Sequence, residues 1–269
     1  MPVITISRDS YSHGKEIAEK VAEKLGYSYI GPEIIQYVSE SLDLPYPILQ
    51  KALHNSPSFL EHIIVRKEKS LALFRSAFFE YMGQDNIVYH GLAGHVFLAD
   101  VPNVIKVRIL ADFDDRITEK MQRENLNYEG AKKRLIKEDK KRERWEKSLY
   151  GIDNHDPSNY DLSLNLHNIS IDKATAIIIG MAQVSMNGHR GLMMKRLNDM
   201  ALEAKTEARL LDVFPEVEAV ARDGEVFVSV RGSILQEEMI VERAKRIVSG
   251  IKGVKEVRIG ILSSEFVPF

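Results

Sequence analysis

The chain has 269 residues, 44% hydrophobic and 28% charged, which is typical of a soluble globular protein with one large or two modest domains. Its formal net charge of −2 indicates no general attraction to nucleic acid or anionic membrane, and the lack of cysteine excludes disulfides, thiol catalysis and cysteine-ligated metals. The chain opens without a signal-peptide pattern and contains no apolar run long enough to span a bilayer, so we expect a cytoplasmic location.

The first 25 residues have the pattern of a buried strand, a polar loop and a helix. Val3–Ile6 is a β-branched run, residues 7–15 are mostly polar and end in Gly14-Lys15, and apolar residues then recur at helical spacing up to Leu25. The backbone N–H groups of such a loop, the start of the helix and the lysine all attract anions. The pattern therefore predicts a phosphate-binding loop.

This loop departs from the pattern G-x-x-x-x-G-K-[ST] at two positions. Asp9 stands at the first glycine, which narrows the backbone shapes open to the loop, and Glu16 replaces the hydroxyl that would meet magnesium. The alternative interpretation is an ordinary strand–loop–helix start to an α/β domain, in which Lys15 is only solvated and no nucleotide binds.

The rest of the amino-terminal part alternates strands with helices. Strands are predicted at 27–30, 86–90, 104–110 and 162–166, and helices at 33–42, 59–81, 129–147 and 172–184. A further helix is predicted to begin after Asp112 or Asp114, either of which can cap it. This order predicts an α/β domain over residues 1–185, with a parallel sheet covered by helices on both faces. Ligands are expected at the carboxyl ends of its strands.

A glycine-containing stretch at 186–196 is predicted to be a linker, and a small α+β domain follows at 197–269. Its expected order is α-β-β-α-β, with a helix at 194–211, strands at 218–222 and 225–231, a helix at 236–249 and a strand at 254–259. Asp223-Gly224 between the first two strands is a hairpin signal.

Several charged residues are candidates for chemistry. The helix at 129–147 carries nine lysines and arginines, so it is either a solvated face or a lid that closes over phosphates. Arg116 lies early in a predicted helix, close to the expected ligand edge, where it either meets a phosphate or is an ordinary surface arginine. Asp161, before the fifth strand, either holds a substrate hydroxyl or amine or caps a turn. His90 and His95 lack the ligand spacing of a metal site, and we expect no protein-bound metal.

In order and spacing, several stretches over residues 3–180 resemble the cytidylate-kinase-like proteins, a branch of the P-loop nucleoside monophosphate kinases. Members of that family commonly lack the first loop glycine and carry glutamate after the basic residue, as this chain does. The matching stretches are Ile4–Asp9 with Ser12–Ala18, Ala111–Arg116, Asp139–Arg142, and Tyr160–Leu162 with Asn165.

The resemblance implies a P-loop kinase fold and the transfer of a phosphoryl group from ATP, with Mg²⁺, to a pyrimidine nucleoside monophosphate such as CMP or dCMP. By position, it implies Lys15, Arg116 and Arg142 as catalytic residues, Ser12, His13, Gly14, Lys15 and Glu16 as ATP-binding residues, and Gly91, Arg116, Arg144 and Asp161 as residues on the substrate side.

The chain also departs from the family pattern. Tyr11 and His13 stand in a loop that is often glycine-rich, and Pro32 and Leu92 stand where arginines are common. Without those two arginines, we expect weaker binding of a nucleoside monophosphate. The alternative function is therefore a nucleotide-binding sensor whose kinase chemistry has decayed and which signals through the carboxy-terminal domain.

The carboxy-terminal domain at 197–269 resembles a BON domain, on the stretches Asp223–Gly232 and Gly253–Val257. Such domains are associated with binding to ligands, membranes or proteins rather than with catalysis. The resemblance implies a binding or regulatory role, with a protein or small ligand as the expected partner.

Overall fold

The computed structural model describes residues 2–41, 47, 64–91, 93–184 and 189–263. Among these, two compact units are distinguished. The first contains the described residues up to Ile34 and those from Gln84 to Met193, and the second contains those from Ile35 to Gly83 and from Met194 onward. Among the helices described, none combines the length and the hydrophobicity that a membrane-spanning segment needs.

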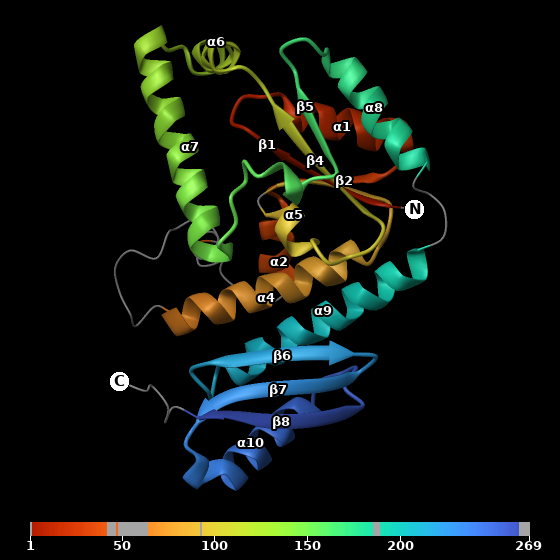
Figure 1. Cartoon of the computed structure of the whole chain (residues 1–269), viewed down its shortest axis with the longest axis vertical. Helices are drawn as coiled ribbons and strands as arrows, with labels where there is room; N and C mark the ends of the chain where they lie inside the picture. Colours follow the sequence, from red (N-terminus) through yellow and green to blue (C-terminus); the bar gives the residue numbers. More distant parts are fainter. Residues whose placement is uncertain (1, 42–46, 48–63, 92, 185–188, 264–269) are drawn as a thin grey trace. The chain divides into compact units, whose positions relative to one another are not determined.

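The first unit is built on a five-stranded parallel sheet with the order β2-β3-β1-β4-β5 (Figure 1). The predicted α/β class with a parallel sheet is confirmed. From the central β1 the chain moves to one side for β2 and β3, and to the other side for β4 and β5. The strand order therefore reverses at β1, and open α/β sheets bind ligands at such a point. The strands are β1 Val3–Arg8, β2 Ser28–Ile30, β3 Ile87–His90, β4 Val104–Leu110 and β5 Leu162–Asn165.

Helices cover both faces of this sheet. Helices α1 (Gly14–Leu25) and α8 (Ile171–Val184) pack against each other and against Ile4 and Ile6 of β1. Because neighbouring residues of a strand point to opposite faces, Thr5 and Ser7 lie on the other side. There they meet the short helix α5 (Gly94–Phe97), through Gly94 and His95.

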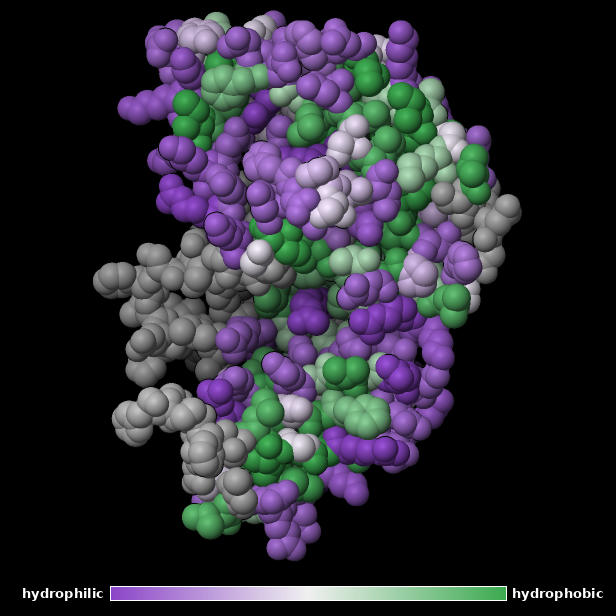
Figure 2. All heavy atoms as spheres, in the orientation of Figure 1, coloured by the Kyte–Doolittle hydropathy of each residue, from purple (hydrophilic) through white to green (hydrophobic). Residues whose placement is uncertain are grey.

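Helices α6 (Phe113–Glu124) and α7 (Tyr128–Tyr150) form a hairpin that packs around Ile117, Ala131 and Leu135. Asn127 caps α7 by accepting a hydrogen bond from the Gly130 backbone N–H at 2.8 Å. Asp112 takes the N-cap position of α6, but its side chain makes no capping hydrogen bond. Figure 2 shows mostly hydrophilic side chains on the face that this hairpin presents, as the charged sequence of α7 predicts.

The second unit contains a mixed three-stranded sheet with the order β6-β7-β8, in which β7 pairs antiparallel with β6 and parallel with β8. The predicted α-β-β-α-β order is found, and Asp223 and Gly224 turn the hairpin with φ of 56° and 88°. The elements of this unit are α4 Ile64–Met82, β6 Val217–Arg222, β7 Glu225–Gly232, α10 Glu237–Ser249 and β8 Glu256–Ser263, together with α2 Ile34–Ser41 and α9 Arg190–Leu210, whose first residues are assigned to the first unit.

Helix α4 belongs to the second unit, although it precedes three strands of the first unit in the sequence. Ala72 packs with Ala208 and Leu211 beside α9, and Arg75 pairs with Glu207 at 3.3 Å. Helix α9 begins at Arg190, so part of the stretch expected to be a linker is helical. Residues 186–188 of that stretch, and 59–63 of the predicted long helix, lie outside the described residues.

Three acidic residues of α9 hydrogen-bond to the edge strand β6 and to the turn residue that follows it. Asp199, Glu203 and Glu207 accept from the backbone N–H groups of Asp223, Ala221 and Ala219, at 2.9, 3.1 and 3.3 Å. The spacings match because four helical residues rise about 6.0 Å and two strand residues about 6.7 Å. The carboxylates thus occupy edge groups that could otherwise pair with another chain.

We expect Glu203→Ala to lower the free energy of unfolding by about 2 kcal/mol, because it leaves the buried Ala221 N–H without its acceptor and removes the ion partner of Arg196. Urea unfolding followed by circular dichroism measures the change. Glu242→Ala, at an exposed position of α10, is the control and should change the value by less than about 0.5 kcal/mol. Equal effects of the two substitutions would contradict a specific role for this hydrogen bond.

Candidate functional site

The loop between β1 and α1 has a backbone shape that usually requires glycine. Tyr11 and His13 have φ of 61° and 56°, in the left-handed region. Side chains other than glycine are disfavoured there, so neighbouring groups must hold the loop in place. Ser12 contributes, since its buried Oγ donates to the Asp9 carbonyl at 2.9 Å and lies 3.3 Å from the Ile109 carbonyl.

Helix α1 starts directly after this loop, at Gly14. The His13 side chain makes no capping hydrogen bond, so it leaves the first N–H groups of the helix to other acceptors. A Cβ on Gly14 would lie 2.7 Å from two side-chain carbons of Arg8. Glycine at position 14 therefore allows the Arg8 side chain to lie across the start of α1. The Nε atom of Arg8 donates to His90 Nε2 at 2.8 Å.

The Tyr11 side chain anchors the loop to the α6–α7 hairpin. Its hydroxyl donates to Glu124 and accepts from Lys120 Nζ at 3.1 Å, and Lys120 Nζ lies 4.4 Å from the ring centroid. Lys120 is fully buried and also contacts Glu124 and Glu138, both at 2.8 Å. Burial alone would lower the pKa of Lys120, but these hydrogen bonds raise it, so the lysine stays charged.

A pocket of about 110 Å³ lies at the carboxyl ends of β1 and β4. Three guanidinium groups and three carboxylates contribute to its wall, so its formal charge is balanced if the histidine is neutral. It is lined by Arg8, Asp9, Arg108, Arg116, Asp139, Glu143, Asn154 and His155.

Two of these guanidinium groups are bound to carboxylates. Arg116 Nη2 donates to both carboxylate oxygens of Asp139, at 2.7 and 2.6 Å, and Arg116 Nε donates to the Ser10 carbonyl at 2.7 Å. Arg108 Nη2 donates to Asp9 at 2.8 Å. Planar arginine forks of this kind bind phosphate as well as carboxylate. An anionic ligand in the pocket must therefore compete with Asp9 and Asp139.

A chain of polar side chains lies behind Arg108. Its Nη1 donates to the Tyr160 hydroxyl at 3.2 Å, that hydroxyl lies 3.3 Å from His95 Nε2, and His95 Nδ1 lies 2.9 Å from Ser7 Oγ. Burial lowers the pKa of His95 to about 4, and the positive charges of Arg108 and Lys106 also lower it, while a hydrogen bond with Asn154 opposes them. His95 is therefore neutral at pH 7 and adds no charge to the site.

The residues predicted for ATP binding lie beside this pocket rather than in its wall. The Lys15 side chain is 59% exposed and its Nζ lies 3.7 Å from Glu19, while Glu16 lies 3.3 Å from Lys20. The Nδ1 atom of His13 lies 3.6 Å from Glu16. Of the residues predicted from the sequence, Arg116 lines the pocket.

The residues predicted for the substrate side are dispersed. Asp161 lies just before β5, and its carboxylate accepts from the Lys106 backbone N–H at 2.8 Å, so it lies at the end of β5 opposite the ligand edge. Gly91 follows β3, where a Cβ would collide with the Tyr89 hydroxyl. Arg144 is exposed on α7, and the side chain of Arg142 and all of Leu92 lie outside the described residues.

Sequence reasoning missed the other seven pocket residues, among them Arg8, Arg108 and Asn154. A signal for Arg108 was present, because a charged residue within a strand that is covered on both faces must have a buried partner. Arg8 stands at the end of β1, where strand alternation alone does not say what its side chain meets. Asn154 follows α7 in an irregular segment, and its sequence context gives no signal.

Comparison with known proteins gives one family match. The sequence model of the cytidylate kinase-like family matches residues 3–168. No curated protein sequence matches the chain significantly.

Solved structures resemble the chain at low sequence identity. A crystal structure of an uncharacterized protein from Eubacterium ventriosum is 21% identical over 68% of this chain and 99% of that one, with a TM-score of 0.51, and supports the fold alone. TT1252 from Thermus thermophilus is 15% identical over 70% of this chain and 98% of that one, with a TM-score of 0.42. Shikimate kinase from Acinetobacter baumannii, in complex with shikimate, is 10% identical over 70% of this chain and 96% of that one, with a TM-score of 0.39. Both are too dissimilar to support an inference.

The lowered pKa of His95 predicts a loss of stability in acid. Between the ordinary value of 6.5 and about 4, the unfolded chain binds a proton that the folded chain does not, so stability falls as the pH falls. At pH 4 to 6, we expect the free energy of unfolding of the wild type to fall more steeply than that of His95→Gln, by up to about 1.4 kcal/mol per pH unit. Urea unfolding at several pH values measures both slopes.

The control for this measurement is His189→Gln, at an exposed position. It should retain the slope of the wild type. Parallel curves for the wild type and His95→Gln would contradict the prediction.

Proposed function

Because the chain belongs to the cytidylate kinase-like family, we propose that it transfers the terminal phosphoryl group of ATP to a nucleoside monophosphate, with CMP or dCMP as the expected acceptor. In this reaction the bond from the γ-phosphorus to the bridging oxygen breaks, a bond to a phosphate oxygen of the acceptor forms, and ADP and a nucleoside diphosphate leave. The observation that carries the proposal is the group of Arg8, Arg108 and Arg116 beside the uncapped start of α1.

The β1–α1 loop and the arginines would have different roles in the phosphoryl transfer. The backbone N–H groups at the start of α1, with Lys15, would hold the ATP phosphates, and Arg116 and Arg108 would offset the charge that spreads over the transferred group. The exposed position of Lys15 is compatible with this role, because a surface pair such as Lys15–Glu19, at 3.7 Å, is worth only about 0–1 kcal/mol. A phosphate can replace the glutamate at little cost.

The described residues fit the ATP phosphates better than they fit a protein-held Mg²⁺. Glu16 stands where a serine or threonine hydroxyl would meet the metal, and its carboxylate pairs with Lys20. Mg²⁺ keeps several waters and is commonly bound through substrate phosphates. When bound, it would supply further neutralisation of phosphate charge, and the chain's own contribution would be to position the phosphates.

Helix α7 would have to move, or Asp139 would have to rotate, before Arg116 could bind phosphate. Asp139 is 35% exposed while Arg116 is 8% exposed, so the carboxylate is the partner that water can reach. Exchange of this carboxylate for a phosphate would make α7 the lid that its charged sequence suggests, with Arg142 and Arg144 as further candidates for phosphate contacts.

The rival function is a nucleotide-binding sensor without turnover. The observation that favours it is the balanced charge of the pocket, where Arg108 and Arg116 already have carboxylate partners. The exposed Pro32, at a position where the family often has arginine, also removes a possible contact to a monophosphate.

The carboxy-terminal unit would serve as a binding or regulatory module in either case. The family match ends at residue 168, so this role rests on the resemblance of residues 197–269 to a BON domain. A protein or a small ligand is the partner we propose for it.

A phosphoryl-transfer screen with ATP, Mg²⁺ and all common nucleoside monophosphates tests the proposed reaction. We expect the wild type to form ADP with CMP or dCMP, and Lys15→Ala to lose at least about a hundredfold in rate because it loses charge next to the phosphates. Lys24→Ala, at the exposed far end of α1, should retain the rate of the wild type. If the wild type forms no ADP with any acceptor, it is not a nucleoside monophosphate kinase.

Calorimetry of ATP binding to Asp139→Asn, together with the turnover assay above, distinguishes the kinase from the nucleotide-binding sensor. Loss of the competing charge frees Arg116, so we expect ATP to bind several-fold more tightly than to the wild type. Glu129→Gln, at an exposed position in the first turn of α7, should change nothing. Tighter binding together with turnover supports the kinase, tighter binding without turnover supports the sensor, and unchanged binding means that phosphate does not reach Arg116.

A further inference from the structure

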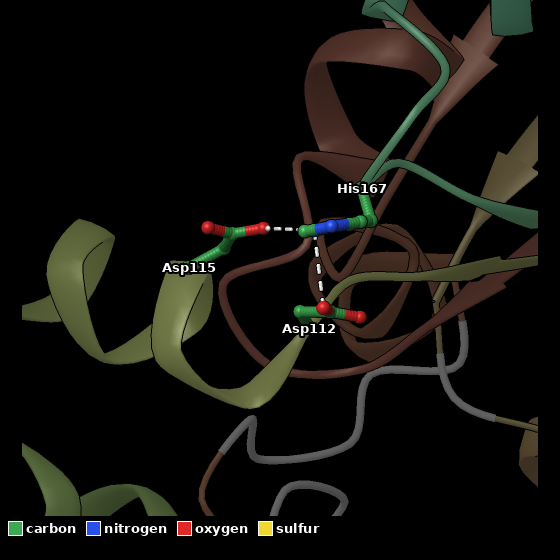
Figure 3. Close-up of side chains that lie close together, drawn as sticks. All are labelled: Asp112, Asp115 and His167. Atoms are coloured by element: carbon green, nitrogen blue, oxygen red, sulfur yellow. Dashed lines mark hydrogen bonds and ion pairs between the residues drawn. The ribbon is translucent and has the colours of Figure 1, made fainter.

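Three side chains that could bind a metal converge next to α6, outside the arginine-lined pocket. Asp112 and Asp115 come from the start of α6, and His167 comes from the segment after β5 (Figure 3). His167 Nδ1 lies 3.0 Å from Asp112 Oδ2 and 3.3 Å from Asp115 Oδ2. One candidate ligand atom from each residue lies within 4.8 Å of the other two.

The sheet positions these groups. β4 and β5 are parallel neighbours with Leu110 opposite Asn165, and the Leu166 N–H donates to the Leu110 carbonyl at 2.9 Å. Asp112 and His167 each follow two residues after this pair, so they leave the sheet side by side. A turn then fixes His167, since its backbone N–H donates to the Asn165 side chain at 3.0 Å.

The ligand types and distances suit a first-row transition metal. An imidazole nitrogen with two carboxylate oxygens is a donor set for Zn²⁺ and related ions, whereas Mg²⁺ and Ca²⁺ prefer oxygen alone. Metal–ligand bonds of about 2.05 Å place neighbouring ligand atoms about 2.9 Å apart in an octahedron and about 3.3 Å apart in a tetrahedron. The two distances from His167 Nδ1 lie in this range.

Local charge also favours a cation. Asp112 and Asp115 carry two negative charges, and the ion partner that the structure gives each of them is His167. The carboxylate of Asp112 is not used as a helix cap. A divalent ion would balance both charges and bind all three side chains. Their exposure, 47%, 60% and 53%, leaves open positions for water and implies moderate affinity.

We propose that Asp112, Asp115 and His167 bind one divalent transition-metal ion of the Zn²⁺ type. The ion would bridge the start of α6 to the segment after β5. Because the Arg116 backbone N–H bonds to the Asp112 carbonyl at 3.0 Å, the ion would brace the helical turn that carries a pocket arginine. The proposal does not depend on the proposed kinase reaction.

Calorimetry with Zn²⁺ on the full-length, metal-free chain tests the site. We expect one equivalent to bind, with weaker binding at lower pH because the metal needs an unprotonated imidazole. His167→Ala and Asp112→Asn should each weaken binding at least about tenfold. His189→Ala, which removes an exposed histidine elsewhere, should bind as the wild type does, and circular dichroism checks that each variant is folded.

Substitution with Co²⁺ gives a second measurement that does not depend on any enzymatic activity. The visible absorption of bound Co²⁺ should appear with the wild type and with His189→Ala, and should be lost with His167→Ala. The proposal is overturned if the wild type binds no stoichiometric Zn²⁺. It is equally overturned if folded His167→Ala and Asp112→Asn bind Zn²⁺ as tightly as the wild type.

Discussion

The candidate site depends on the buried guanidinium group of Arg116. It donates to the Ser10 carbonyl in the β1–α1 loop and to both carboxylate oxygens of Asp139 on α7, while its own backbone belongs to α6. A buried arginine needs such partners, because an unpaired charge would be expelled from the interior. One side chain therefore links the loop to the two helices around the pocket.

The contacts of Tyr11 and Lys120 support the same arrangement from the other side of the loop. Tyr11 takes a left-handed backbone conformation that its side chain disfavours, and its contacts with Lys120 and Glu124 compensate for this cost. A glycine at position 11 would have no side chain to contact the α6–α7 hairpin, whereas Tyr11 hydrogen-bonds to it. The wall of the pocket and the β1–α1 loop are thereby both joined to α7, through Asp139 and Glu138.

In the second unit, the small sheet has an edge strand, β6, whose outward backbone N–H groups need hydrogen-bond acceptors. Carboxylates of α9 accept from alternate N–H groups of β6 and from that of the turn residue Asp223, and α4 packs on α9 through small residues such as Ala72 and Ala208. The cost of burying these acids raises the pKa of Asp199 and of Glu207. The edge of the sheet is closed by side chains rather than by a further strand.

Sequence patterns alone predicted the strands, most of the order of the elements and the α/β class, because strand and helix periodicity, glycines and turn residues act over a few neighbouring positions. Periodicity also located Arg116 near the ligand edge. The three-dimensional structure was needed to show that Arg8 and Arg108 lie beside Arg116, that Asp161 lies at the other end of β5, and that α4 packs on α9. Those outcomes depend on which side chains meet across distant segments, and short-range sequence patterns carry no information about such contacts.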